Sequence, residues 1–238
     1  MLRLTDADAV VVKPAGLSSE APGGGSGGGT RGALRTGARG GPRTLIDIAR
    51  QQLGWPDAQL PHRLDRPTRG LVVVARDRTA VAAHSQAIRE GRWTKHYVAR
   101  IGVPPEFGDP HSLVGEHRAY IRREGKLARL VRSGGDPARL TCIMVVPDVS
   151  FHLLRNFHAL IRLDTGRYHQ IRAMFAALGA PLVGDADYGG DAGRFYLEHA
   201  SLSFPDPASG KLVRVFDPHD PDREPMHVDL TSALAALE

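Results

Sequence analysis

The 238-residue chain has a single cysteine and no long hydrophobic run. Cys142 alone cannot form an intrachain disulfide or a cluster of thiolate metal ligands, a pattern that is typical of a reducing compartment. The longest apolar stretches, such as residues 71–75, are too short to cross a bilayer. We therefore expect a cytoplasmic protein with no membrane partner.

Sequence motifs that hold metals or nucleotides are also missing. Eleven histidines are present, but no HExxH, HxH or Cys and His spacing groups them, which argues against zinc. The chain contains no G-x-x-x-x-G-K-[ST] phosphate loop, no G-x-G-x-x-G with its acidic partner and no G-x-S-x-G nucleophile elbow. We expect no metal and no nucleotide cofactor.

Acidic residues are fewer than basic residues in this chain. The 31 Lys and Arg exceed the 26 Asp and Glu, which gives a net charge of +5 and favours phosphate-bearing partners without requiring them. Seven basic residues between Arg118 and Arg139 stand against only Glu124 and Asp136. By itself this segment fits a solvated face or a flexible loop as well as an RNA contact.

Periodicity and capping signals predict a mixed chain of strands and helices. Residues 21–42 hold ten glycines and no acid, so we expect a flexible Gly/Arg-rich insert there. The 42% hydrophobic content is enough for a substantial core. Strands are predicted over 9–12, 71–75, 95–102 and 157–163, and helices over 44–54, 79–90 and 171–178.

The first polar cluster is the run His62, Arg63, Leu64, Asp65, Arg66, on a loop that enters the buried strand 71–75. This placement would hold a carboxylate rigidly and leave it accessible to a ligand. An aspartate between two arginines is nevertheless more often half of an ion pair than a nucleophile. Local sequence therefore favours a structural role for Asp65.

The second cluster, residues 164–172, runs from a strand end through a glycine turn into a helix start. Such a helix N-terminus offers N–H groups to an anion, and Arg167 and Arg172 add fixed charge. Taken alone, a capped helix with solvent-facing basic residues is the better interpretation. Tyr97, central in an alternating strand, would by default be a packed aromatic residue.

Taken in order, these pieces resemble a known family. Four blocks carry the resemblance: VVVKPAGL at 10–17, HRLDRPTRGLVVVAR at 62–76, KHYVARIG at 95–102 and LDTGRYHQIRAMFAALGAPLVGDADYG at 163–189, with a weaker block, HASLSFPDP, at 199–207. They are similar to the RluA-like branch of the RNA pseudouridine synthases, and they cover nearly the whole chain apart from the insert.

The resemblance implies roles for individual residues. Asp65 would act on the ribose carbon joined to the base, by direct attack or through a glycal. Tyr97 would pack on the target uracil and is a candidate general base, and Arg172 would pair with Asp65 through a bidentate contact that keeps it ionised. The target uridine would be flipped out of its stack. The implied substrate-binding residues are His62, Arg63, Leu64, Thr68, Arg167, His169, Gln170 and Ile171.

The resemblance also implies the architecture. We expect one α/β (α+β) catalytic domain over residues 1–238, with a mixed, largely antiparallel sheet, flanking helices and a central RNA-binding cleft, and no separate N-terminal RNA-binding domain. The partner would be ribosomal RNA, transfer RNA or both, bound by a monomer. Departures from the family pattern at Pro67, Arg69 and Asp136-Pro137 put substrate choice in doubt more than chemistry.

Two rival hypotheses remain at this stage. One is a catalytically silent RNA-binding protein or RNA chaperone on the same scaffold. The other is a small hydrolase that uses Asp65 with His62 or His169 around a metal. The sharpest structural prediction is that Asp65, Tyr97 and Arg172, which are far apart in sequence, meet in one cleft.

Overall fold

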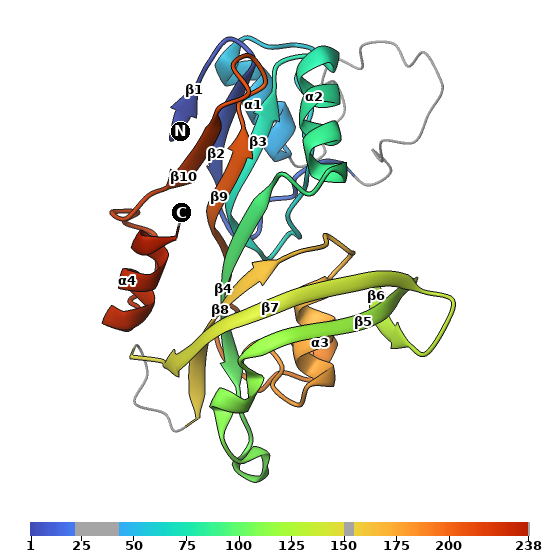
Figure 1. The fold of residues 1–238 in the computed structure, drawn as a ribbon, viewed down its shortest axis with the longest axis vertical. Coiled ribbons are helices and arrows are strands. Elements are labelled where there is room, and N and C mark those ends of the chain that lie inside the picture. Colours follow the sequence, from blue (N-terminus) through green and yellow to red (C-terminus); the bar gives the residue numbers. More distant parts are fainter. Residues whose placement is uncertain (22–42, 150–154, 238) are drawn as a thin grey trace.

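A computed structural model describes residues 1–21, 43–149 and 155–237. Within these residues, ten strands form one sheet in the order β1-β2-β3-β9-β4-β8-β7-β5-β6, and β10 pairs with β9 (Figure 1). The expected insert at 21–42 lies outside the described residues except for Ala21. The family-implied α+β architecture is confirmed.

The bounds of the elements are as follows. The strands are β1 (Arg3–Leu4), β2 (Asp8–Lys13), β3 (Arg69–Ala75), β4 (Thr94–Gly102), β5 (Gly115–Glu124), β6 (Leu127–Val131), β7 (Asp136–Pro147), β8 (Asn156–Leu163), β9 (Leu197–Pro205) and β10 (Leu212–Phe216). The helices are α1 (Leu45–Leu53), α2 (Arg78–Arg89), α3 (Gln170–Ala177) and α4 (Val228–Ala236), with short 3-10 turns at Pro105–Phe107, Pro110–Leu113 and Ala186–Tyr188.

Capping explains where the first helix begins and ends. The Thr44 hydroxyl accepts a hydrogen bond from the Asp47 N–H, and the Asp47 carboxylate accepts one from the Thr44 N–H at 3.1 Å. Gly54 ends the helix in the left-handed conformation, with φ of 67°. Both signals are legible in the sequence, and the predicted helix is confirmed. The basic segment, for which a loop was one expectation, instead forms β5, β6 and the start of β7.

The sheet is antiparallel except at one junction. There β3 and β9 run parallel over two residue pairs, Arg69 with Glu198 and Gly70 with His199. Gly70 has φ of +113°, and a Cβ added to it would lie 2.6 Å from the backbone nitrogen of His199. This position therefore requires glycine, since a side chain would push the two strands apart.

The two faces of the central strands are covered by different helices. Tyr97 and Ile161 belong to a core shared with Ile171 of α3, whereas their neighbours Val98 and Leu160 pack with α4 through Leu230 and Leu234. Alternate strand residues point to opposite faces. We call the face towards α3 the inner face and the face towards α4 the outer face.

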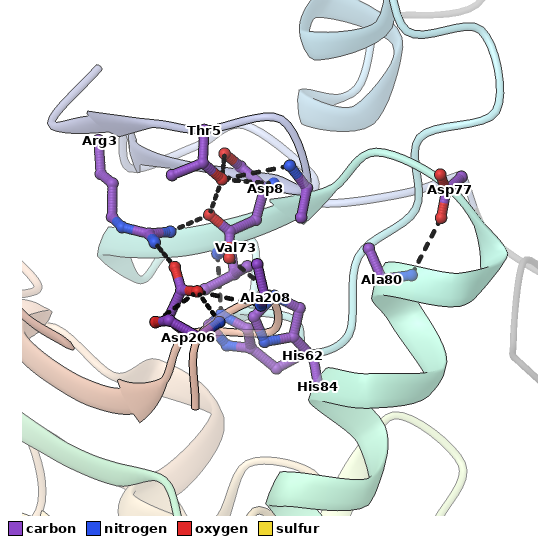
Figure 2. A network of polar contacts seen from close by, with 12 residues as sticks. Arg3, Thr5, Asp8, His62, Val73, Asp77, Ala80, His84, Asp206 and Ala208 are labelled. Atoms are coloured by element: carbon purple, nitrogen blue, oxygen red, sulfur yellow. Dashed lines mark hydrogen bonds and ion pairs between the residues drawn. The ribbon is translucent and has the colours of Figure 1, made fainter. Parts of the chain in front are cut away.

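A buried polar network fastens the N-terminal strands to α2 (Figure 2). The carboxylate of Asp8 contacts Arg3, the Thr5 hydroxyl at 3.0 Å and the His84 ring at 3.1 Å. Arg3 also pairs with Asp206, in the turn after β9. The side chains of Asp8 and His84 are fully buried. These buried polar contacts fix β2 and β3 relative to α2.

Candidate active site

A cavity of about 920 Å³ opens on the inner face. It lies among the loop that precedes β3, the first half of β4 and the N-terminal end of α3. Every candidate site residue predicted from the sequence contributes to its lining: Asp65, Tyr97, Arg172, His62, Arg63, Leu64, Thr68, Arg167, His169, Gln170 and Ile171. Three segments that are far apart in sequence therefore converge on one site.

Asp65 lies in the loop before β3, with about a quarter (26%) of its side chain exposed. A turn in which the Thr68 N–H donates to the Asp65 carbonyl at 3.1 Å holds the loop. Burial raises the pKa of Asp65, although the positive charges of Arg172 and Lys13 act in the opposite direction. From the sequence we expected the guanidinium to dominate, but desolvation outweighs it.

Arg172 is buried and held by acids other than Asp65. It donates from Nε and Nη2 to the two carboxylate oxygens of Asp185 at 2.7 and 2.6 Å, and from Nη2 to Asp187 at 2.9 Å. Burial opposes the charge, but the hydrogen bonds to Asp185 raise the pKa of Arg172. The bidentate contact expected with Asp65 is thus made with Asp185, and Arg172 acts on Asp65 through its charge.

Tyr97 is buried at the base of the cavity. Its ring stacks on His199 of β9, with centroids 4.6 Å apart and planes 13° from parallel. Among the described residues its hydroxyl has no hydrogen-bond partner. Burial, and then the charge of Asp65, raise the pKa of Tyr97. The hydroxyl therefore remains protonated at neutral pH, which weakens its expected role as a resting general base.

Lys13 is a site residue that was not singled out from the sequence. It ends β2 fully buried, and its ammonium donates to the carbonyls of Pro14 at 3.0 Å, Leu17 at 2.8 Å and Arg66 at 3.3 Å. Burial lowers the pKa of Lys13 to about 8, while Asp65 opposes the shift. The available signal was a lysine at the end of a β-branched run, directly before Pro-Ala-Gly.

The turn into α3 is built by its own side chains. The Gln170 side-chain carbonyl accepts from the Thr165 hydroxyl at 2.8 Å and from the Arg167 N–H at 2.9 Å, so this amide shapes the turn. His169 adopts φ of 51° and stacks on Tyr168. Burial and Arg172 lower the pKa of His169 to about 4. The neutral ring lies 3.9 Å from Asp65 and forms no ion pair with it at neutral pH.

The loop before β3 is anchored on both sides. His62 accepts a hydrogen bond from the Val73 N–H at 3.0 Å, as Figure 2 shows, and burial lowers its pKa well below the ordinary value. Leu64 is buried and its N–H donates to the Ser19 hydroxyl at 3.2 Å. Arg63 is exposed at the rim, 3.3 Å from Glu20. The Thr68 hydroxyl is buried without a hydrogen-bond partner among the described residues.

The departures from the family pattern lie outside this lining. Pro67 and Arg69 do not contribute to the cavity wall. Arg69 points away from it and pairs with Glu198 at 2.9 Å and with Asp220 at 2.7 Å. At the third departure, the Pro137 carbonyl accepts from Arg167 at 2.9 Å. Arg69 therefore has a structural role, because it forms ion pairs away from the cavity.

Two of the exclusions made from the sequence can be examined in the described residues. They contain no group of three or more His, Cys, Asp or Glu side chains arranged to hold a metal ion. None of their helices is long and apolar enough to cross a membrane. The metal-dependent hydrolase hypothesis therefore gains no support from the described side chains.

Comparison with known proteins gives a consistent assignment. The family model for RNA pseudouridylate synthase matches residues 9–177. An uncharacterized RNA pseudouridine synthase of Mycobacterium bovis is 32% identical over 229 residues, covering 92% of this chain and 68% of that protein. The dual-specificity RNA pseudouridine synthase RluA of Vibrio vulnificus is 31% identical over 185 residues, covering 75% and 73% of the respective chains.

A solved structure agrees at the level of the fold. Human RNA pseudouridylate synthase domain containing 1 superimposes with a TM-score of 0.64 at 22% identity, covering 99% of this chain and 94% of that one. The residues matched by the family model include Asp65, Tyr97 and Arg172, the three positions that converge on the cavity. The chain therefore belongs to the RNA pseudouridylate synthase family, enzymes that isomerise uridine within RNA.

Proposed function

We propose that this enzyme converts specific uridines of ribosomal RNA, transfer RNA or both into pseudouridine, with Asp65 as the central catalytic group. The observation that carries the proposal is the convergence of Asp65, Tyr97 and Arg172 on one cavity. At about 920 Å³ the cavity is large enough for a flipped nucleotide.

The reaction needs only a rearrangement of bonds. The glycosidic N1–C1′ bond breaks, the uracil turns within the cavity, and C5 forms the new bond to C1′. C5 loses one proton and N1 gains one, so atoms balance without a redox partner or metal. Asp65, as a carboxylate, either attacks C1′ directly or assists formation of a glycal.

The neighbours of Asp65 set the conditions for this step. Because burial raises the pKa of Asp65, the charges of Arg172 and Lys13 are needed to favour its ionised form. Tyr97, protonated and buried, would serve mainly as the packing surface for the uracil ring. Arg63, exposed at the rim, would contact the phosphate backbone or fill the space left by the flipped base.

The proposal also includes the domain organisation, the cellular location and the oligomeric state. The continuous sheet of the described residues supports one catalytic domain over residues 1–238. A single cysteine supports a cytoplasmic location. A cavity assembled by one chain supports a functional monomer.

The deciding experiment maps pseudouridine in ribosomal and transfer RNA from cells that lack the protein. The cells are rescued in parallel with the wild type and with Asp65→Asn. We expect one or a few sites to vanish and only the wild type to restore them, while Asp65→Asn still binds the same RNA. Restoration by Asp65→Asn would refute the catalytic role, and an unchanged map would favour a catalytically silent RNA-binding protein.

A further inference from the structure

The outer face of β5, β6 and β7 presents an exposed group of arginines around a tyrosine. Side chains of β5 alternate, so buried Ile121 points to the inner face while Tyr120 and Arg122 point to the outer face. Tyr120 is 50% exposed. We call the following residues the outer platform: Arg118, Tyr120, Arg122, Arg129, Val131, Pro137 and Arg139.

Strand register arranges the platform in three rows. Arg118 of β5 stands directly opposite Arg139 of β7. Two residues further along, Tyr120 stands between Val131 and Pro137, and after two more Arg122 faces Arg129. At about 3.3 Å per residue, the two arginine rows lie roughly 13 Å apart, with the aromatic row between them.

This arrangement opposes the stability of the sheet. Like charges directly opposite each other on adjacent strands are destabilising, and the platform contains two such pairs. Glu116 and Glu124 pair with Arg118 and Arg122 along β5, but these contacts are exposed and worth little. Arg139 also lies 3.6 Å from the Asp164 carboxylate. Four arginines against three acids leave the face positive, and an exposed tyrosine at its centre adds a hydrophobic surface that folding does not use.

The platform is connected to the cavity around the edge of the sheet. β6 is the terminal strand of the sheet. Arg123, the neighbour of Arg122 in β5, points to the inner face, lines the cavity and lies over the Tyr168 ring at 4.3 Å. Adjacent arginines thus point to opposite faces near the β5–β6 hairpin turn. An extended polyanion that leaves the cavity needs to cross only the sheet edge formed by β6 to reach the platform.

We propose that the outer platform binds a single-stranded segment of the substrate RNA that flanks the target uridine. The two arginine rows contact phosphates, and Tyr120 stacks on a base between them, the combination by which proteins hold single-stranded RNA without base-specific readout. The inference rests on the proposed function, because it names a second contact for the same substrate on the face of the sheet opposite to Asp65.

The test compares three variants of the enzyme with the wild type. Arg122→Gln/Arg129→Gln removes one arginine row, and Tyr120→Ala removes the aromatic row. The control, Arg78→Gln/Lys211→Gln, removes two exposed charges from α2 and from the turn between β9 and β10. The probe is total ribosomal and transfer RNA from cells that lack the enzyme. Binding is measured over a range of KCl concentrations, followed by the kinetics of pseudouridine formation.

For Arg122→Gln/Arg129→Gln we expect Kd and KM to rise about tenfold near 0.1 M KCl with kcat unchanged, and the salt slope to fall by roughly 1.5, because about two phosphate contacts are lost. Tyr120→Ala should raise Kd with no change in salt slope. The control should keep the wild-type Kd and slope to within about twofold, since it has no phosphate contact to lose.

A thermal readout separates binding from a structural role. Because the arginine pairs repel each other, Arg122→Gln/Arg129→Gln should melt at or above the wild-type temperature. Two outcomes would overturn the proposed RNA contact at the outer platform. One is a Kd and salt slope in this variant equal to those of the wild type, and the other is a Kd that rises equally in the control. Absence of pseudouridine formation by the wild type would count against the proposed function alone, because the binding comparison does not depend on activity.

Discussion

Lys13 is a buried side chain outside the cavity lining that acts on Asp65, the proposed catalytic group. Its ammonium binds three carbonyls around the base of the loop that carries Asp65, one of them from Arg66, the residue after Asp65. Its charge lowers the pKa of Asp65 against the effect of burial. The residue therefore positions the loop and helps to keep the carboxylate ionised.

Replacing Lys13 with Met should move the acid limb of the kcat/KM profile to higher pH. Burial raises the pKa of Asp65 and Lys13 lowers it, so removing Lys13 raises it further and the carboxylate becomes protonated at a higher pH. Lys211→Met, an exposed lysine, is the control. An acid limb unchanged in Lys13→Met would show that Lys13 does not influence Asp65.

Stability gives a second test of Lys13. Its pKa is about 8 in the folded protein, against an ordinary value of 10.5 for a lysine in an unfolded chain, so between these values the unfolded chain binds more protons. The free energy of unfolding should therefore rise with pH through that window in the wild type, and this contribution should be missing in Lys13→Met. Urea unfolding at both ends of the window measures the difference.

The family resemblance identified eleven of the residues that line the cavity but not the partners that hold them. Local sequence favoured structural roles for Asp65 and for the 164–172 cluster, and both became recognisable only because their motifs matched a family in order. Asp185, which holds Arg172, and Lys13, which holds the loop, were not recognisable as such. Their roles depend on carbonyls and guanidinium groups that approach only after the chain has folded.

At the scale of elements, the parallel junction of β3 with β9 depends on a glycine. Gly70→Ala should lower the free energy of unfolding by about 3 kcal/mol or more, because the added methyl meets the His199 backbone and the positive φ strains it. Gly54→Ala is the matched control. It also has positive φ, but no atom lies within 4 Å of the added methyl, so about 1 kcal/mol is expected.

Chemical denaturation of both glycine variants provides the comparison, with pulse proteolysis as the readout if Gly70→Ala yields little folded protein. Similar losses in the two variants would mean that the β3–β9 junction tolerates a side chain. A loss confined to Gly70→Ala would confirm that the close approach of His199, and not backbone conformation alone, fixes this position.

Elements with clear boundaries were the predictable ones. Thr44 and Gly54 delimit α1, and an uninterrupted apolar run marks β3, so local chemistry alone specifies both. The β5–β6 hairpin was not predicted, because its exposed arginines obscure the alternation of its few buried residues. The order of strands could not be deduced from periodicity, since pairing between distant strands is decided by tertiary packing.

At the scale of the whole molecule, Arg69 ties the C-terminal segment to the central sheet. It pairs with Glu198 of β9 and with Asp220 beyond β10, and Arg223 adds a 3.0 Å contact to the same glutamate. All of these side chains are at least 88% buried. Breaking a buried pair from one side leaves uncompensated charge, which typically costs about 3–5 kcal/mol.

Arg69→Ser should therefore lower the melting temperature while leaving kcat/KM of the folded enzyme unchanged. The reason is that Arg69 does not line the cavity. Arg78→Ser, at an exposed position of α2, serves as the control. A large change in kcat/KM without loss of stability would instead assign Arg69 to substrate selection.

The short β3–β9 junction also has a consequence for the order in which the enzyme assembles during synthesis. Its residue pairs join β3 to a strand that begins only at Leu197. Chains leave the ribosome N-terminus first, and contacts between distant segments form last. Asp65 and Tyr97 emerge well before β9, the strand that lies between β3 and β4. The growing chain would therefore carry the Asp65 carboxylate without a formed site, and catalytic competence would arise only after β9 has been synthesised.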